Sequence, residues 1–411
     1  MTSLGRSQAS YDAIIVGARC AGAATAMLLA RRGLRVLVVD RSGYGSDTLS
    51  TNALMRGGVL QLARWGVLDT IVAAGTPAVR RVSFHYDDET LEVPIANRDG
   101  VEALYAPRRT VLDRVLSDAA QAAGADVVYG VRLVDLVRDP QGRVTGAVIE
   151  DRHEGVRSIR ADVVIGADGI RSTVARLVGT ETTHLGSHAG WVVFGYWGGL
   201  PVDGYHWHYR LGVSAGVIPT NDDQTLVFAA APPWRFRTSS GVDTAGGYRR
   251  VIEAVAPELA GRFERAELAG PLHGFAGELG YLRRCWGPGW ALVGDAGYFR
   301  DPITAHGITD ALRDAELLAR AVVDGSPRAL ADYEATRNDL VMDLFQVTDE
   351  IASYAWEMPR VRDLHRALSK AMNQEVRMLN ALGDWPARGG RTKPTAAVAA
   401  PPATVAALGA S

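Results

Sequence analysis

The alternation of apolar and polar positions divides the first forty residues into strand, turn, helix and strand. Residues 12–16 (DAIIV) and 35–40 (RVLVVD) are short apolar runs, which are typical of strands covered on both faces. Residues 21–32 between them are rich in helix formers, and Gly33 stands where a helix end favours a left-handed residue. This order predicts a βαβ unit, whose parallel strands belong to a sheet covered by helices.

Helical and extended patterns alternate along the rest of the chain. The helical pattern recurs at residues 56–72, 110–123, 308–324 and most of 330–382. Extended segments are expected at residues 127–129, 144–149, 161–165 and 290–293, with a hairpin at 79–94 that turns at Asp87 and Asp88. Residues 191–231 alternate with period two and are rich in aromatic residues, which predicts an antiparallel sheet in a second layer or domain. From residue 388 no period remains, which predicts a disordered tail.

The composition of the chain limits which partners it is expected to bind and where in the cell it is expected to lie. The chain has 411 residues, 47% of them hydrophobic, and a formal charge of −2, which does not indicate a nucleic-acid groove or binding to an acidic membrane. Its two cysteines, Cys20 and Cys285, cannot form a disulfide framework, and no metal-ligand spacing is present. The N-terminus lacks a signal-peptide layout and no run approaches eighteen apolar residues. We therefore expect a soluble, cytoplasmic protein without stable membrane insertion.

The first candidate site is residues 17–22 (GARCAG), between a predicted strand and helix. A GxGxxG loop here would place a pyrophosphate at the positive helix end, but Arg19 replaces the middle glycine. Its side chain must point away from the phosphates or contact them. Asp40 ends the next strand eighteen residues after Gly22, which suits the ribose hydroxyls of a dinucleotide. The loop taken alone would also fit a structural turn in another α/β protein.

Two later stretches also carry a strand into a loop and a helix. Residues 161–176 (ADVVIGADGIRSTVAR) contain Asp168 and Gly169 at the end of the predicted strand. Residues 290–314 (WALVGDAGYFRDPITAHGITDALRD) deliver Gly294 and Asp295 in the same way, and Gly307 opens the next helix. The N–H groups of that helix would stabilise negative charge on a reduced flavin.

The three stretches, in this order and separation, resemble the group A FAD-dependent monooxygenases of the para-hydroxybenzoate hydroxylase type over residues 11–320. The resemblance implies that the first stretch binds the ADP half of FAD and that Asp168 serves both pyrophosphate and NAD(P)H binding. It implies that Asp295 holds the ribityl chain and that Pro302 lies beside the flavin ring. Arg109 matches the family's arginine at a helix start near the cofactor, with Arg108 as the alternative.

The motifs GARCAG and GDAGYFRDPITAHG more narrowly resemble a bacterial subgroup of these enzymes tied to secondary metabolism. Its members usually carry Gln where this chain has His306. Residues 47–52 fall where the family places a segment against the flavin. The candidate cofactor-binding residues are Gly17, Ala18, Cys20, Ala21, Gly22, Asp40, Arg41, Arg109, Asp168, Gly294, Asp295, Pro302, Gly307 and Ile308.

The implied fold is α/β, or α+β overall: a Rossmann-type FAD-binding domain interleaved with an antiparallel-sheet substrate domain, followed by C-terminal helices. The FAD-binding domain is assigned to residues 11–78, 100–185 and 268–330. The substrate domain is assigned to residues 79–99 and 186–267, the helices to 331–388 and the tail to 389–411.

The polar and aromatic candidates each have a structural alternative. His306 either caps the following helix or touches the flavin pyrimidine edge or the substrate, where it would tune protonation. It is the catalytic candidate, with Pro302 beside the flavin. Cys20 is interpreted as a packing residue. Four aromatic residues are substrate-binding candidates, although most aromatics of this region would pack between the sheet and the FAD domain: Trp191, Tyr196, Trp207 and Phe228.

The reaction implied by the resemblance is monooxygenation. NAD(P)H reduces FAD, O2 adds at C4a, and the flavin hydroperoxide hydroxylates or epoxidises a small apolar, aromatic or polycyclic natural-product intermediate. The chain shows no second dinucleotide loop. NAD(P)H would therefore bind transiently, or a flavin reductase would supply the electrons. The pattern leaves the oligomeric state open.

Three other functions were weighed against monooxygenation. A flavin-dependent prenyl reductase of the geranylgeranyl type would pass hydride to C=C bonds, and residues 205–219 (YHWHYRLGVSAGVIP) weakly resemble its aromatic motif. A flavin-dependent halogenase needs a lysine near the active site, but the first lysine is Lys370. A scaffold or cyclase that binds FAD without net redox change is the non-oxidoreductase alternative.

Overall fold

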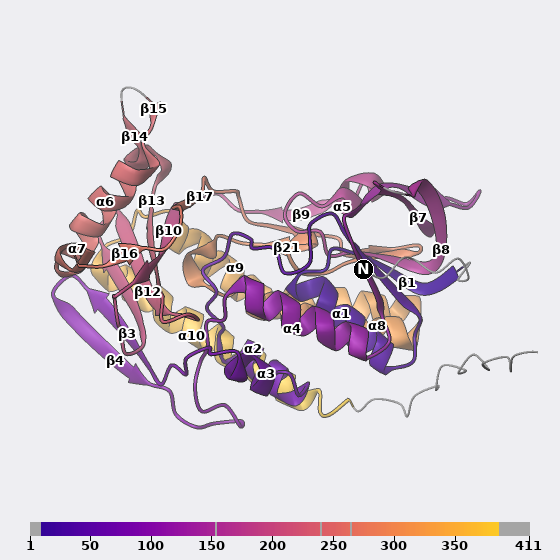
Figure 1. Cartoon of the computed structure of the whole chain (residues 1–411), viewed down its shortest axis with the longest axis horizontal. Helices are drawn as coiled ribbons and strands as arrows, with labels where there is room; N and C mark the ends of the chain where they lie inside the picture. The colour runs from indigo at the N-terminus through magenta and orange to yellow at the C-terminus, as the bar shows by residue number, and fades with distance from the viewer. Residues whose placement is uncertain (1–9, 153, 239–240, 264, 386–411) are drawn as a thin grey trace, which may run out of the picture.

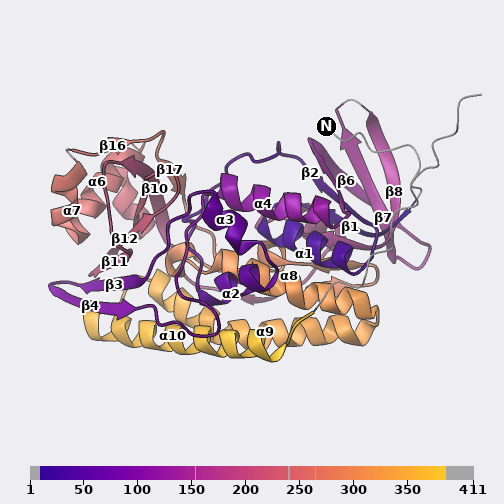
Figure 2. The ribbon, with the colours of Figure 1, turned by 60° about the horizontal axis from the view of Figure 1, so that its bottom comes forward.

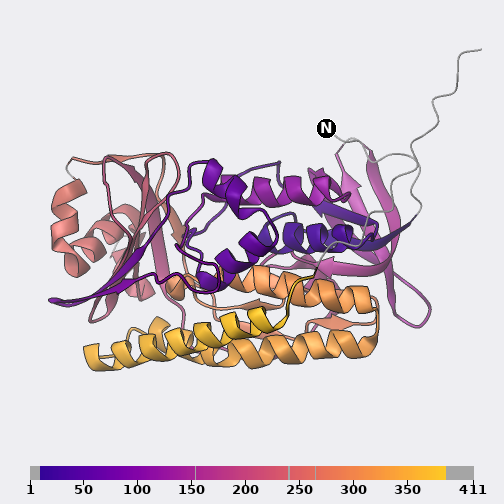
Figure 3. The ribbon, with the colours of Figure 1, turned by 90° about the horizontal axis from the view of Figure 1, so that it is seen from below.

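A computed structural model describes residues 10–152, 154–238, 241–263 and 265–385 (Figure 1). One end of the elongated molecule holds a sheet covered by α1 and α8, and the other holds a second sheet covered by α6 and α7 (Figure 1). The helices α9 (Pro327–Ala352) and α10 (Met358–Ala381) run side by side along the length of the molecule (Figure 2, Figure 3). The predicted disordered tail from residue 388 lies outside the described residues.

The first sheet contains the predicted βαβ unit at its centre. Its parallel strands follow the order β20 (Trp290–Leu292), β8 (Gly155–Gly166), β1 (Ser10–Val16), β2 (Val36–Asp40) and β5 (Asp126–Tyr129). Helix α1 (Cys20–Arg31) connects β1 to β2, and Gly33 has the left-handed φ of 85° that ends it. These strands are apolar because α1, α4 (Arg109–Ala122) and α8 (Gly307–Asp324) pack in the same core.

This sheet extends further than the sequence pattern predicted. The strand β6 (Val131–Arg138) was missed, although its buried residues Val131 and Leu133 follow period two. It pairs with β7 (Val144–Asp151), and β7 pairs with the first half of β8. The strand β8 is therefore longer than residues 161–165, because its first half joins this antiparallel extension. The short strand β19 (Trp286–Gly287) pairs with β20.

The helix expected over residues 56–72 is two helices, so that prediction was wrong. The first is α2 (Arg56–Arg64) and the second is α3 (Leu68–Ala73). Gly66 between them has a φ of 69°, which a right-handed helix cannot contain.

The second sheet confirms the predicted antiparallel region. The hairpin of β3 (Arg81–Tyr86) and β4 (Glu89–Pro94) forms its edge and turns at Asp87, as expected. Parallel pairing between β3 and β11 joins this early hairpin to a strand more than a hundred residues later. The remaining strands in sheet order are β11 (Tyr205–Arg210), β12 (Val213–Pro219), β13 (Thr225–Ala231), β10 (Trp191–Gly198) and β16 (Glu267–Leu268), with β17 (His273–Phe275) also on β10.

Period two divides the side chains of this sheet between two cores. Val193 and Val227 pack with α6 (Thr244–Val255) and α7 (Pro257–Phe263), whereas Phe194 and Phe228 point to the main core. Small elements complete the fold: α5 (Thr173–Val178), β9 (Thr182–Leu185), β14 (Arg237–Thr238), β15 (Gly241–Val242), β18 (Tyr281–Arg283) and β21 (Tyr298–Phe299). Across the described ranges, no helix is both long and apolar enough to cross a membrane.

Candidate functional site

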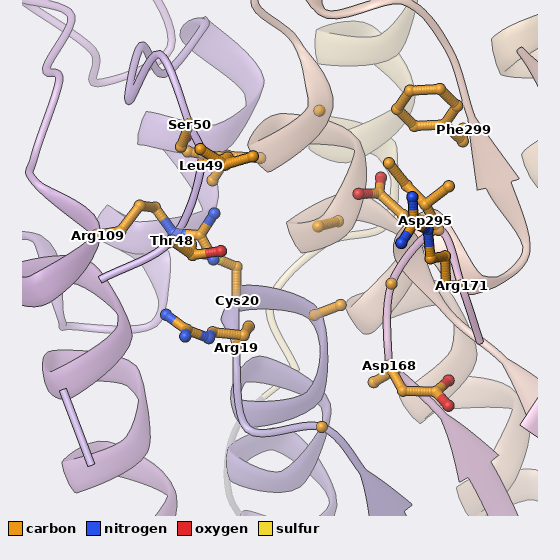
Figure 4. Close-up of a pocket in the computed structure, with 18 of the residues that line it drawn as sticks. Arg19, Cys20, Thr48, Leu49, Ser50, Arg109, Asp168, Arg171, Asp295 and Phe299 are labelled. Carbon is orange, nitrogen blue, oxygen red and sulfur yellow. The ribbon is translucent and has the colours of Figure 1, made fainter. Parts of the chain in front are cut away.

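A cavity of about 610 Å³ lies where the carboxyl ends of β1, β2 and β8 meet the start of α8. All three stretches identified in the sequence line it, together with residues 48–53 and the inner side of β10. Figure 4 shows Arg19 and Arg109 on one side of this cavity, with Asp295, Arg171 and Phe299 opposite. The cavity therefore joins the ends of the parallel sheet to the second sheet.

The glycines of the first stretch are required by close packing. Gly17 has a φ of 106°, and a Cβ there would lie 2.3 Å from the carbonyl oxygen of Ala167. A Cβ on Gly22 would lie 1.9 Å from the carbonyl oxygen of Gly17. The middle position has an ordinary extended backbone, with a φ of −82°, and accepts a side chain. Only the first and third glycines of the loop are therefore needed for its shape.

The side chain of Arg19 extends across the cavity mouth toward α4 (Figure 4). It donates to the carbonyl oxygen of Ser46 at 2.6 Å and to Asp113 at 3.0 Å. Arg109 and the thiol of Cys20 also bind Asp113, at 3.0 and 3.1 Å. Burial raises the pKa of the Cys20 thiol, which therefore stays protonated. Asp113 thus gathers three residues of the cavity wall and leaves the start of α1 unobstructed.

Two predicted acidic residues are engaged by the backbone. Asp40 accepts hydrogen bonds from the N–H groups of Ala18 and Ser42, both at 2.7 Å, so it holds the loop of residues 17–22 to the end of β2. Asp168 accepts from Ser172 and from the N–H groups of the first turn of α5. Both aspartates line the cavity, and both oxygens of Asp40 and Oδ1 of Asp168 can each accept another hydrogen bond.

Asp295 lies at the wall opposite Arg109 (Figure 4). Burial and the nearby Asp310 carboxylate raise the pKa of Asp295 to about 7, although the charge of Arg109 opposes this shift. Pro302 and Gly307 line the same wall, and no atom lies within 4 Å of the position of a Cβ on Gly307. Asp295 can therefore act as a hydrogen-bond donor or acceptor near neutral pH.

His306 is the N-cap residue of α8, but its side chain makes no capping hydrogen bond, so the expected capping role is wrong. The ring is buried, and Nε2 lies 2.8 Å from Glu375 of α10. Ligand atoms of His306, Asp310 and Glu375 lie within 4.8 Å of one another, as in a metal site. The guanidinium of Arg313 takes the place of a metal ion here, because its Nη1 lies 2.6 Å from Asp310 and 2.7 Å from Glu375.

Most of the predicted cofactor-binding residues meet at this cavity. Those that line it are Gly17, Cys20, Ala21, Asp40, Arg41, Arg109, Asp168, Asp295, Pro302, Gly307 and Ile308. Ala18, Gly22 and Gly294 lie behind them and are not lining residues. Arg108, the alternative to Arg109, instead stacks on Tyr196 at 3.6 Å.

The four aromatic substrate candidates are buried and do not line the cavity. Trp191 faces α6, whereas Tyr196, Trp207 and Phe228 point to the main core. Their role in substrate binding stays a prediction. The apolar wall is instead formed by Val192, Phe194, Phe275 and Phe299. Phe194 is two residues from Tyr196 on β10, so the period of the strand could have selected it.

Other residues at or near the cavity could not be selected individually from the sequence pattern. Asp113 and Glu375 are ordinary acidic positions on helical faces until the fold places them beside Cys20 and His306. Asn52 lies in the segment expected against the flavin and has a φ of 62°. Its Nδ2 donates to Tyr196, while its buried Oδ1 has no partner in the described part of the chain.

These observations fit an FAD molecule. Neither Arg19 nor His306 caps its helix with its side chain, so the starts of α1 and α8 retain N–H groups for a pyrophosphate and for a flavin. Two buried polar atoms of lining residues, Asn52 Oδ1 and His306 Nδ1, have no hydrogen-bond partner among the described residues. The volume of the cavity is in the range of cofactor sites. At Gly17 and Gly307 no side chain projects into it.

A family model described as an FAD binding domain matches residues 10–238, and the chain belongs to this family. A menaquinone reductase of Mycolicibacterium smegmatis is 27% identical over 354 residues, or 81% of this chain and 80% of the relative. A digeranylgeranylglycerophospholipid reductase of Methanococcoides burtonii is 27% identical over 342 residues, or 79% and 78%.

Solved flavoenzyme structures share the fold. The flavin-dependent brominase Bmp2 superposes with a TM-score of 0.74 at 20% identity, over 92% of this chain and 94% of the other. PqsL, a probable FAD-dependent monooxygenase from Pseudomonas aeruginosa, superposes with a TM-score of 0.72 at 21% identity, over 89% and 100%. The family and the cavity together define this chain as an FAD-dependent oxidoreductase of mixed α/β fold.

Proposed function

We propose that the chain is an FAD-dependent monooxygenase that uses NAD(P)H and O2 to hydroxylate or epoxidise an aromatic or polycyclic natural-product intermediate. The observation that carries the proposal is the apolar wall of the cavity. Val192, Phe194, Phe275 and Phe299 form this wall and line the same cavity as the start of α8. An electron-rich, flat substrate would pack against these aromatic rings with its reacting carbon toward the flavin.

Bound FAD supplies the electron transfer and the oxygen activation, and the chain positions it. The uncapped start of α1 would hold the pyrophosphate, and Asp295 would bind the ribityl hydroxyls. The start of α8 would favour negative charge at the pyrimidine end of the reduced flavin. The apolar wall would exclude water from the reacting face, which protects the activated oxygen from side reactions.

Incorporation of oxygen tests this proposal directly. The FAD-loaded protein is incubated with NADH or NADPH and a panel of aromatic and polycyclic compounds under ¹⁸O2. We expect substrate-stimulated oxidation of NAD(P)H and a product that is heavier by one ¹⁸O atom. A Phe194→Ala variant should raise the substrate KM while FAD binding is retained. A product that forms only by hydrogenation would overturn the proposal. So would a protein that consumes electrons neither from NAD(P)H nor from a reductase.

A prenyl reductase that transfers hydride to C=C bonds is the second candidate function. The similarity to the menaquinone and digeranylgeranylglycerophospholipid reductases over about four fifths of the chain favours it. Such an enzyme works without oxygen. Turnover of an isoprenoid substrate under strictly anaerobic conditions, with deuterium transferred from a labelled donor, would establish the reductase and contradict the monooxygenase.

Halogenation receives no support from the cavity. A halogenase needs a lysine near the flavin to handle hypohalous acid. Lys370 is exposed on α10 and does not line the cavity, whereas Lys393 lies outside the described residues.

A further inference from the structure

A buried ionic cluster lies beneath the first turns of α8 and is closed by the C-terminal helix α10. Glu375 of α10 binds a histidine and an arginine with its two oxygens. Oε2 lies 2.8 Å from His306 Nε2, and Oε1 accepts from Arg313 at 2.7 Å. All three side chains are at most 1% exposed. Through this cluster Glu375, near the end of the described chain, contacts His306 in the wall of the FAD cavity.

Two carboxylates and two guanidinium groups surround the imidazole of His306. Burial alone would raise the pKa of Glu375, but the charges of His306 and Arg313 and their hydrogen bonds hold it at about 2. Glu375 is therefore ionised, and its Oε2 accepts a hydrogen bond from the Nε2–H group of His306. Asp310 adds a second negative charge 4.0 Å from Nε2, and Arg313 and Arg300 each bind Asp310.

Helix α2 also packs here and contributes a glycine. A Cβ on Gly57 would lie 3.2 Å from Glu375 Oε2, so a larger residue would crowd the carboxylate that binds His306. The charged group that α2 adds here is Arg64, which binds the carbonyl oxygen of Leu379 on α10 and lies 3.8 Å from Glu316 of α8.

The second ring nitrogen of His306 lacks a partner. Nδ1 is buried and makes no hydrogen bond to any described residue, although His306 is part of the cavity wall. A buried ring nitrogen without a hydrogen-bond partner costs about 1–3 kcal/mol, so a ligand atom is expected to satisfy it. The group that enters this cavity is FAD, and its pyrimidine end carries carbonyl oxygens that accept hydrogen bonds.

We propose that Glu375 holds His306 as an imidazolium whose Nδ1–H binds the pyrimidine end of FAD, so that α10 stabilises the reduced, anionic cofactor. His306 contacts the cofactor, and Glu375 acts as the positioning residue behind it. The inference rests on FAD binding, and it holds whether the bound substrate is oxygenated or hydrogenated.

The midpoint potential of bound FAD, measured by anaerobic dye-coupled titration without substrate, tests the proposal. Glu375→Gln keeps a hydrogen-bonding side chain and removes the charge, while His306→Gln removes the imidazolium itself. Each variant should bind reduced FAD about tenfold more weakly relative to oxidised FAD, a shift of about 30 mV to lower potential for a two-electron couple. Because no substrate is present, a failure here is separate from a failure of the proposed reaction.

His365 offers a matched control on the same helix. It is a buried histidine that binds Tyr86 at 2.8 Å and does not line the cavity, so His365→Gln should leave the potential unchanged. Wild-type potentials for folded, FAD-saturated Glu375→Gln and His306→Gln proteins would overturn the proposal.

A measurement on the unaltered protein covers the case in which a variant does not fold. With an anionic reduced FAD, one proton accompanies two electrons, and the potential should fall by about 30 mV per pH unit from pH 6 to 9. A change to twice that slope within this range would show that the reduced cofactor takes up a second proton, which would contradict the proposal.

Discussion

The helices α1 and α8 lie side by side and both begin at the cavity, but they are built in opposite ways (Figure 1). The buried face of α1 carries no charged residue, and its loop depends on Gly17 and Gly22. Helix α8 instead buries Asp310, Arg313, Asp314 and Glu316. The start of α1 is therefore shaped by steric packing, and the start of α8 by paired charges.

This difference matches the two ends of an FAD molecule. A pyrophosphate has a constant charge, so its site needs N–H groups at the right distance and no side chains in the way. A flavin ring changes charge during the reaction, so its site needs fixed charges and dipoles. Variants at the two helix starts can therefore separate steric packing from paired charge.

Gly22→Ala should abolish the fold of the α1 end. The new Cβ would lie 1.9 Å from the carbonyl oxygen of Gly17, which is backbone and cannot move aside alone. We expect a loss of more than about 4 kcal/mol in the free energy of unfolding, measured by urea denaturation, and loss of FAD binding. Gly43→Ala is the control, because nothing lies within 4 Å of its Cβ position. Equal stability of the two variants would contradict a steric role.

Arg313→Met should destabilise the α8 end through charge. Arg313 binds Asp310, Asp314 and Glu375 at 2.6–2.7 Å, and all of these groups are buried. Leaving the carboxylates without their cation should cost about 3–5 kcal/mol in thermal or chemical unfolding. Arg360→Met, at an exposed pair with Glu350, should have no measurable effect. A neutral effect of Arg313→Met would show that packing, and not charge, supports α8.

Asp295→Asn should change how the stability of the FAD-free protein depends on pH. Because the pKa of Asp295 is raised in the folded state to about 7, its contribution is complete below about pH 4 and is lost as the pH rises toward 7. Each pH unit in that window removes about 1.4 kcal/mol of this contribution from the wild type, whereas the variant lacks the contribution and keeps all other titrating groups. The two unfolding curves should therefore diverge by up to about 4 kcal/mol between pH 4 and pH 8. Parallel curves would show that Asp295 ionises normally.

Arg19→Gly restores the glycine that the loop lacks and should have the smallest effect. The variant loses the bonds to Ser46 and Asp113, which we expect to cost about 1 kcal/mol and to speed hydrogen exchange near Ser46. FAD affinity, measured by fluorescence titration, should stay within about threefold. A large loss of affinity would show that the Arg19 side chain reaches the phosphates after all.

Local patterns were enough to predict the elements around the cavity. The βαβ unit, the hairpin turning at Asp87 and the stretches ending in Asp168 and Asp295 depend on residues close in the sequence. The break between α2 and α3 was missed because Gly66 alone is weak evidence against a helix with apolar residues on both sides. The strand β6 was missed because a register shift between Leu133 and Asp135 breaks its alternation.

Local sequence patterns are enough to predict a dinucleotide-type loop, two further strand ends with acidic residues, and an aromatic antiparallel sheet. These features follow from backbone periods and turn geometry, which act over a few residues. The direction of the Arg19 side chain and the partners of His306 and Asp113 depend instead on how the helices pack. Arg19 meets Asp113 across 94 positions and His306 meets Glu375 across 69, because burial of a charge selects any opposite charge that the fold brings within reach. Such pairs leave no period in the sequence, so they become visible only when the helices are packed.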